Sequence, residues 1–279
     1  MFNLLSLKRQ VNEIFIGKGI DDKSETDWLF CNVLKISRTE LLMKTEVTFW
    51  QHIKILRLAK KRARGIPLSH IFRESYFYGL TFKVNKSVLT PRKETELLVE
   101  QIINDYKGTK NKKILDLCTG SGAIAVALSK NLKDKITASD ISNSALKVAR
   151  HNIKHLDASV TLLKSDLFEN ITGKFNAIVS NPPYIKTEDI DSLQVEVKKY
   201  DPLLALDGGN DGLDFFKEII KKAPQKLEEN GRIYLEVGKG QAKAVSKLLE
   251  KNFINIKIIK DYSGVERIVY ATKGKSYDK

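Results

Sequence analysis

The chain has 279 residues, of which 42% are hydrophobic and 29% are charged, and its formal net charge is +14 at pH 7. This composition excludes a disordered or fibrous protein, and the length suits one large domain with a smaller companion. Two cysteines are too few for a disulfide framework, and no stretch approaches about 20 apolar residues, so we expect a cytoplasmic protein without a membrane segment.

The positive charge has two interpretations. A basic surface can bind nucleic acid or an acidic partner. Most of the basic residues, however, are lysines scattered along the chain, and a compositional drift toward lysine explains them better than a designed groove. We therefore expect no stable binding of nucleic acid.

Residues 1–73 have the pattern of a small helical domain. Ser24 and Asp27, and again Ser37 and Glu40, have the spacing of a helix N-terminal cap before an apolar run. The next segment carries apolar residues at positions 49, 50, 53 and 56, which predicts a helix with one apolar face.

That helix is expected to stop at Gly65, and its end carries the densest basic run of the chain, KKRAR at 60–64. We interpret this run as a solvated helix end, where cations suit the helix dipole. A docking surface is the alternative.

His151 and His155 stand four residues apart on another predicted helix, a spacing that can bind a metal. Because no carboxylate or cysteine completes a set, we interpret them as a surface pair and expect no metal.

The pattern changes after the helical domain. Residues 76–90 alternate aromatic and β-branched residues with turn formers, which predicts a β-hairpin, and we assign 74–90 to a linker. In 91–279, strands and helices alternate, which indicates an α/β, Rossmann-like, mostly parallel sheet with helices on both faces. The last two predicted strands follow each other without a helix, which implies one antiparallel edge strand.

A glycine-bearing turn follows the first strand of this domain, predicted over 113–117. Ligands of open parallel sheets bind beyond the carboxyl ends of the strands, where glycines admit close approach and a helix N-terminus offers free N–H groups. We therefore assign the whole turn to cofactor binding, namely Cys118, Thr119, Gly120, Ser121 and Gly122.

Acidic residues at neighbouring strand ends narrow the choice of cofactor. Asp140 can accept hydrogen bonds from ribose hydroxyls, and Asp166 can accept one from an adenine amino group while Leu167 packs on the ring. The turn lacks the G-x-G-x-x-G of dinucleotide sites, and Asp116 would repel a pyrophosphate. Asp116 favours a cationic ligand with an amino group, which predicts S-adenosylmethionine.

The motif Asn181-Pro182-Pro183-Tyr184 ends the fourth predicted strand, beside the cofactor turn. Proline has no N–H, so the main chain here offers carbonyls without competing donors, and the Asn181 oxygen is a second fixed acceptor. Two fixed acceptors suit a planar –NH₂ group, for which Tyr184 provides a flat wall.

Held in this way, a weakly nucleophilic nitrogen would be oriented toward a methyl donor. We therefore assign all four motif residues to substrate binding and Asn181, Pro182 and Tyr184 to catalysis, with Asn181 also bordering the cofactor. The alternative is a purely structural turn.

The chain resembles class I methyltransferases that carry N-P-P-Y and modify nitrogens of adenine, cytosine, guanine or glutamine. Within that group, residues 65–100, with VLTPRKETE, resemble the linker of the peptide chain release factor glutamine methyltransferase family (HemK or PrmC). The helical front segment and the closing DYSGVERIV resemble the same family, so the resemblance covers nearly the whole chain.

The resemblance implies a substrate-recognition domain at 1–73 and an S-adenosylmethionine-dependent methyltransferase domain at 91–279. The implied reaction methylates the side-chain nitrogen of the glutamine in the Gly-Gly-Gln loop of bacterial class I release factors, with Arg92 among the substrate-binding residues. Two positions depart from the family, since Cys118 replaces the usual glycine and Thr90 the usual isoleucine.

Three other functions stay open at this point. A sister enzyme methylates a glutamine of a ribosomal protein, but it tends to lack the Thr95-Glu96 pair that follows Pro-Arg here. A nucleic-acid amino-methyltransferase would fit the charge but requires a clustered basic face. A non-catalytic binding module would not need both motifs intact.

Overall fold

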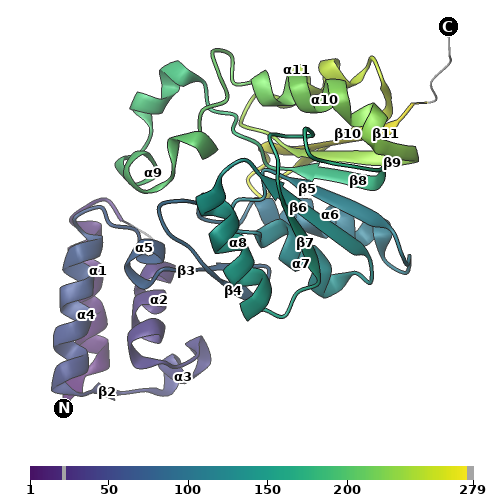
Figure 1. The fold of residues 1–279 in the computed structure, drawn as a ribbon. Helices are drawn as coiled ribbons and strands as arrows, with labels where there is room; N and C mark the ends of the chain where they lie inside the picture. The colour runs from purple at the N-terminus through teal and green to yellow at the C-terminus, as the bar shows by residue number, and fades with distance from the viewer. Residues whose placement is uncertain (21–22, 275–279) are drawn as a thin grey trace, which may run out of the picture. The chain divides into compact units, whose positions relative to one another are not determined.

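The computed structural model describes residues 1–20 and 23–274, which divide into two compact units (Figure 1). The first unit holds Met1–Glu74 together with Val195–Tyr200, and the second holds 75–194 and the chain from Asp201 onward. Among the described helices, none combines the length and apolar character needed to cross a membrane.

The first unit is a helical bundle with one short strand pair, β1 (Phe2–Asn3) and β2 (Glu46–Val47). Its helices are α1 (Leu4–Ile16), α2 (Lys23–Leu34), α3 (Arg38–Met43), α4 (Phe49–Arg62) and α5 (Leu68–Phe72). They share one apolar core, built from leucine, phenylalanine and β-branched side chains of all five helices. Burial of that core is what stabilises helices too short to persist alone.

The caps explain where two of these helices begin. The predicted box at Ser37 is confirmed, because Glu40 N–H donates to Ser37 Oγ (3.2 Å) and Ser37 N–H donates to Glu40 Oε2 (2.7 Å). The prediction at Ser24 is wrong, since α2 already includes Lys23. Thr48 and Gln51 form a second box, at the start of α4, that the pattern analysis missed.

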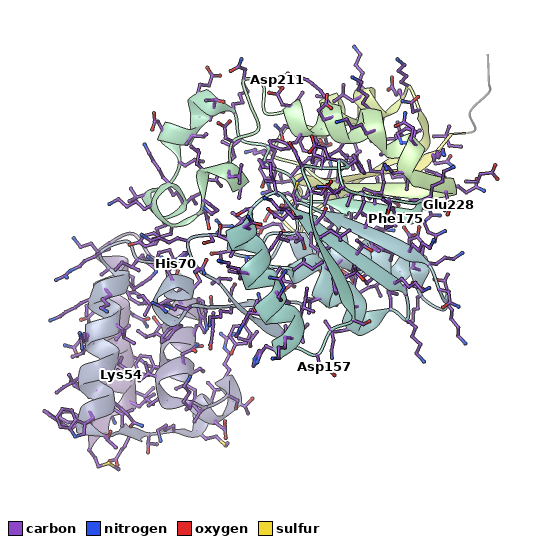
Figure 2. All side chains as sticks on the ribbon, viewed as in Figure 1. Lys54, His70, Asp157, Phe175, Asp211 and Glu228 are labelled. Carbon is purple, nitrogen blue, oxygen red and sulfur yellow. The ribbon has the colours of Figure 1, made fainter. Side chains whose placement is uncertain are left out.

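The predicted apolar face of α4 is only partly right, because Leu56 is the one predicted position that packs against the core. Phe49, Trp50 and Ile53 are exposed, and the helix buries Ile55 and Ala59 instead. Residues four apart share a helix face, so the buried stripe follows the second set and leaves the aromatic set outside. Lys54, labelled in Figure 2, projects from the outer surface of the same helix.

Arg62, the centre of the basic run, is only 4% exposed. Its guanidinium contacts Glu25 Oε2 and Glu196 Oε1, each at 2.5 Å, so Arg62 itself is neither solvated nor available for docking. The other basic residues of the run, Lys60, Lys61 and Arg64, are exposed, as a solvated helix end predicts. Glu196 belongs to α9 (Val195–Tyr200), a segment that follows N-P-P-Y in sequence. The pairing holds α9 in the first unit, as does packing of Tyr200 against His70 of α5, with ring centroids 5.0 Å apart.

The second unit contains a seven-stranded sheet of order β10-β11-β9-β8-β5-β6-β7 (Figure 1). Its strands are β5 (Lys113–Leu117), β6 (Lys135–Asp140), β7 (Val160–Lys164), β8 (Phe175–Ser180), β9 (Leu227–Glu236), β10 (Phe253–Lys260) and β11 (Glu266–Lys273). Neighbours from β9 to β7 pair in parallel, which confirms the predicted fold class. The antiparallel strand is β11, which lies one place inside the edge because β10 pairs along its outer side.

Helices cover both faces of the sheet (Figure 1). On one face lie α6 (Thr95–Tyr106), α7 (Ala123–Asn131) and α8 (Asn143–His155), and on the other α10 (Asp214–Lys226) and α11 (Ala242–Leu249). The predicted hairpin is present as β3 (Glu74–Phe77) and β4 (Leu80–Lys83), whose Phe77 and Phe82 join the core beside α6.

Three features of this unit escaped the sequence analysis. Helix α11 was missed although its buried Ala242, Val245 and Leu249 have helical spacing. The first residues of β9 were assigned to the preceding helix. The segment after N-P-P-Y contains two short 3₁₀ turns, Thr187–Ser192 and Leu203–Ala205, on either side of α9.

Candidate active site

The carboxyl ends of the central strands open into a cavity of about 640 Å³, formed within the second unit. Most of the predicted site residues line it, namely Arg92, Cys118, Thr119, Gly120, Ser121, Asp140, Asp166, Leu167, Asn181 and Pro183. Four others do not: Asp116, Gly122, Pro182 and Tyr184. The turn assigned to the cofactor and the Asn181 motif therefore share one cavity.

The turn after β5 adopts a left-handed backbone at Cys118 (φ +58°), Gly120 (+56°) and Gly122 (+81°). Glycine adopts this conformation without strain, whereas a residue with a Cβ does not. Cys118 thus carries a side chain where the backbone favours glycine. Burial, helped by the charge of Asp140, raises the pKa of its thiol to about 12, so it is not a reactive thiolate.

Gly122 serves packing rather than lining the cavity. A Cβ at this position would lie 3.3 Å from the Cβ of Ala149, so the glycine lets α7 and α8 approach each other.

Asp116 lies beneath the turn and is fully buried. Its Oδ2 accepts a hydrogen bond of 2.6 Å from the hydroxyl of Thr119, while its Oδ1 has no partner among the described residues. Burial raises the pKa of this carboxyl to about 7. The side chain therefore shapes the turn through Oδ2, while Thr119 and the main-chain N–H of Ala125 oppose the rise of its pKa.

Asp140, at the end of β6, braces the same turn. Its Oδ2 accepts from Gly120 N–H and its Oδ1 from Ser142 N–H, both at 2.9 Å. Each carboxylate oxygen can accept a further hydrogen bond, and the residue lines the cavity, so the pair of oxygens is available to two hydroxyl groups of a ligand. Burial raises the pKa of Asp140.

Asp166 and Leu167 follow β7, and both line the cavity. The Leu167 backbone is left-handed (φ +43°), and the hydroxyl of Ser165 holds it by donating to the Leu167 carbonyl at 2.8 Å. Ser165 in turn accepts from Asn170 N–H at 3.0 Å, so a small local network fixes this wall of the cavity.

Asn152 is a supporting residue that the sequence analysis missed. Its Nδ2 donates to the carbonyls of Ser121 (2.9 Å) and Lys83 (3.0 Å), and its Oδ1 accepts from Lys83 N–H (2.8 Å). The buried amide therefore ties the hairpin to the turn. One polar residue on the otherwise apolar face of α8 was the signal that could have revealed it.

Asn181 and Pro183 line the cavity at the end of β8, with Pro182 buried between them. The Asn181 Nδ2 faces the hydroxyl of Thr95 at 3.4 Å, and Thr95 also lines the cavity at the start of α6. This contact directs the amide nitrogen of Asn181 to Thr95 and leaves its oxygen for another partner.

Tyr184 is enclosed by the protein. A Cβ on Gly238 would lie 3.0 Å from the Tyr184 ring, and the Tyr184 carbonyl accepts from Gln241 Nε2 at 2.9 Å. Burial raises its pKa strongly. A Cβ on Gly208 would lie 2.7 Å from Tyr184 Cα and 2.9 Å from the Pro183 carbonyl oxygen, so the motif backbone requires a glycine beside it.

Arg92 forms an ion pair with Asp201, with Nη2 and Oδ2 2.6 Å apart. The N–H of Thr90 donates to the other oxygen of Asp201 at 3.2 Å, so Thr90 acts here through its main chain. The residues that follow, Pro202–Ala205, line the cavity. Arg92 and Thr90 thus anchor a wall of the cavity.

The His151 and His155 rings stack on α8 with centroids 5.9 Å apart and lie on the exposed side of the helix. Nowhere in 1–20 or 23–274 do three or more histidine, cysteine or acidic residues form a group that could hold a metal.

Two family models match the chain. The PrmC N-terminal domain matches residues 10–72, and the methyltransferase small domain matches residues 90–199. The release factor glutamine methyltransferase of Thermodesulfovibrio yellowstonii is 43% identical over 90% of this chain and 93% of its own length. This chain belongs to the release factor glutamine methyltransferase family. The enzyme of the same name from Fusobacterium nucleatum is 40% identical over 89% of this chain and 73% of its own length.

Solved structures agree on the fold of the second unit. A methyltransferase from Pyrococcus furiosus matches with a TM-score of 0.55 at 20% identity, covering 71% of this chain and 91% of that one. The 16S rRNA methyltransferase RsmC of Thermus thermophilus matches with a TM-score of 0.52 at 17% identity, covering 72% and 50%. At these identities the likeness concerns the fold alone.

Proposed function

We propose that this enzyme methylates the side-chain nitrogen of the glutamine in the Gly-Gly-Gln motif of bacterial class I release factors, with S-adenosylmethionine as donor. The observation that carries the proposal is the single cavity lined by both the turn at 118–121 and Asn181. Family membership identifies the reaction class, and the shared cavity supports the proposal because donor and amide would meet there.

The residues present fit S-adenosylmethionine. The cavity, at about 640 Å³, falls in the range of small-molecule sites. Asp140 would accept from the ribose hydroxyls, Asp166 and Leu167 would hold the adenine, and the turn would hold the methionine portion. Asp116 lies beneath the turn and does not line the cavity, so the unpartnered Oδ1 of this carboxyl would favour a cationic amino group in the turn through its charge rather than through a direct hydrogen bond. When bound, the cofactor supplies an electrophilic methyl group on a positively charged sulfur.

The chain's own contribution is to orient the substrate amide. Its nitrogen is a weak nucleophile because the lone pair is delocalised into the carbonyl. The Asn181 oxygen and the Pro182 carbonyl would accept its two protons, raising electron density on nitrogen and fixing its direction. The nitrogen would form its bond to the methyl carbon as the bond between that carbon and the donor's sulfur breaks, and it would then lose one proton to water or a nearby group, so no strong base is required beforehand. In this proposal Tyr184 supports the motif from behind, because it does not line the cavity and so cannot serve as the flat wall that the sequence predicted.

Several finer assignments belong to the same proposal. Arg92 would contact the release factor from the rim of the cavity, where its side chain is 41% exposed. We also assign the enzyme to the cytoplasm, where release factors work, in keeping with two free cysteines. Stable binding of nucleic acid is not part of the proposed function.

The decisive experiment incubates the protein with isotope-labelled S-adenosylmethionine and intact release factor, followed by peptide mass spectrometry. We expect one methyl group on the glutamine of the Gly-Gly-Gln peptide. Parallel reactions with ribosomal proteins and with tRNA or DNA are the controls. Label on ribosomal protein or nucleic acid alone would refute the proposal.

A further inference from the structure

Glu236 ends β9 and is 3% exposed, yet the reaction outlined above gives it no task. Its Oε2 has no hydrogen-bond partner among the described residues. A buried carboxylate is costly unless something in its surroundings uses it. Its neighbours include Thr95 and Asn181: Ser180 pairs with Leu235 in the sheet, so Asn181 and Glu236 follow side by side, and the side chains of Thr95 and Asn181 both lower the pKa of Glu236.

Glu236 does not line the cavity, whereas Thr95 and Asn181 do. It therefore has no direct access to a substrate in the cavity and cannot take a proton from one there. Any effect on the reaction must pass through the two residues that it contacts.

The chemistry of the three side chains fixes a direction. A carboxylate only accepts hydrogen bonds, a hydroxyl donates one and accepts others, and a primary amide has distinct donor and acceptor ends. If Glu236 accepts from the Thr95 hydroxyl, the Thr95 oxygen can only accept from Asn181. The Asn181 Nδ2 indeed faces Thr95 Oγ1 at 3.4 Å.

We propose that Glu236 is a positioning residue that, through Thr95 and by direct contact, orients the Asn181 amide with its oxygen toward the substrate. Thr95 alone could not do so, because its hydroxyl could as well donate to Asn181 Oδ1. The carboxylate removes that second arrangement. This inference rests on the proposed function, since it explains why Asn181 offers the substrate an acceptor.

The charged and titratable neighbours of Glu236 make the orientation of the Asn181 amide sensitive to pH. Burial raises the pKa of Glu236 to about 7, with Glu94 raising it further and Arg267, Thr95 and Asn181 opposing the rise. Tyr184 also faces Glu236, but burial keeps it neutral near pH 7. A protonated Glu236 can donate as well as accept, so the Asn181 amide loses its fixed direction as pH falls through about 7.

The kinetic test compares wild type with E236Q, T95V and the double variant at saturating cofactor. Glutamine matches the size of glutamate but can donate, so E236Q should lower kcat about 10–100-fold, with KM for the release factor changed less than about threefold. The kcat of the double variant should be no lower than that of the slower single variant, because both substitutions interrupt the same series of contacts from Glu236 through Thr95 to Asn181. S246A is the matched control and should leave kcat unchanged. It removes a buried hydroxyl of α11 that has no hydrogen-bond partner among the described residues.

Two further measurements separate positioning from mere stability. The wild-type kcat should fall as pH drops through about 7, and E236Q should lack that inflection while binding cofactor as the wild type does. The side-chain ¹⁵N–¹H signals of Asn181, assigned by their loss in N181D, should shift with pH between about 6 and 8 in wild type only.

The NMR measurement needs no substrate, so it decides the inference even if the proposed substrate is wrong. Equal kcat and equal pH profiles for wild type and E236Q would overturn the role of Glu236 and leave the proposed function intact. Asn181 signals that ignore pH in both proteins would overturn it as well. Absence of methyl transfer to release factor by wild type would count against the proposed function alone.

Discussion

The two halves of the cavity are held in different ways. The cofactor half is stabilised by neighbours in sequence and by the next strand, as when Thr119 bonds to Asp116 and Gly120 to Asp140. The Asn181 half depends on residues far along the chain, including Thr95 and Gly208. The turn assigned to the cofactor thus depends largely on short-range contacts, with Asn152 as one distant support, whereas the contacts around Asn181 come mainly from distant residues.

The sharpest test of this contrast is N181A, which removes the acceptor of the second half alone. We expect kcat to fall about 10²–10³-fold, because one fixed polar contact to the transition state is lost. Cofactor affinity, measured by calorimetry, should stay within about threefold of wild type, since the turn at 118–122 is untouched. N131A removes an exposed amide of the same kind and should retain full activity. Near-normal turnover by N181A would break the contrast.

G208A tests whether the motif backbone depends on a distant glycine. The new Cβ would lie 2.7 Å from Tyr184 Cα, and such overpacking costs about 1–3 kcal/mol of unfolding free energy. We expect that loss in urea denaturation together with a clear loss of kcat. G79A is the control, because Gly79 has a positive φ but no atom within 4 Å of the added Cβ, so it should cost stability without changing kcat. Equal losses of kcat in G208A and G79A would contradict the dependence of the motif backbone on Gly208.

D116N tests how far the buried carboxyl of Asp116, in the cofactor half of the cavity, lowers the free energy of unfolding when no ligand is bound. The folded chain, with the pKa of Asp116 raised to about 7, holds a proton that the unfolded chain releases near about pH 4. The free energy of unfolding should therefore fall as pH rises from 6 to 8, by about 1 kcal/mol for this group.

D116N should remove that part of the slope in urea denaturation at the two pH values. Glu236, with its pKa also raised to about 7, should keep a similar slope in the variant. D211N, at an exposed carboxyl whose pKa is lowered by a hydrogen bond from Lys217, is the control and should leave the slope between pH 6 and 8 unchanged. An unchanged slope in D116N would show that its carboxyl does not titrate in this range.

The smallest expected effect is that of C118G. Replacing a left-handed cysteine by glycine relieves about 1–2 kcal/mol of strain and costs about 0.5–1 kcal/mol of chain entropy. We expect a net gain of about 0.5 kcal/mol in thermal and urea unfolding. G122A, at φ +81° and 3.3 Å from the Ala149 Cβ, should lose stability instead. A destabilised C118G would mean that the thiol packs better than the backbone strain costs.

The sequence predicted correctly the features that depend on local patterns, and it failed where distant residues decide the packing. Alternating strands and helices predicted the parallel sheet, because each strand end and glycine turn is a local pattern. The apolar face of α4 was placed largely on the wrong side, since Phe49, Trp50 and Ile53 fit a helical stripe as well as the stripe that is buried. Periodicity predicts that a helix has faces, but a partner decides which one is covered.

The sequence by itself determined the fold class and the reaction family, and most of the site residues that it predicted line the cavity, because strand-end glycines, acids and N-P-P-Y act through their own backbone and side-chain chemistry. The tertiary structure decided the rest. It buried Arg62 between Glu25 and Glu196, joined Asn152 to the hairpin, and placed Glu236 behind Asn181. Those partners lie up to 134 positions apart, and only packing brings such distant residues into contact.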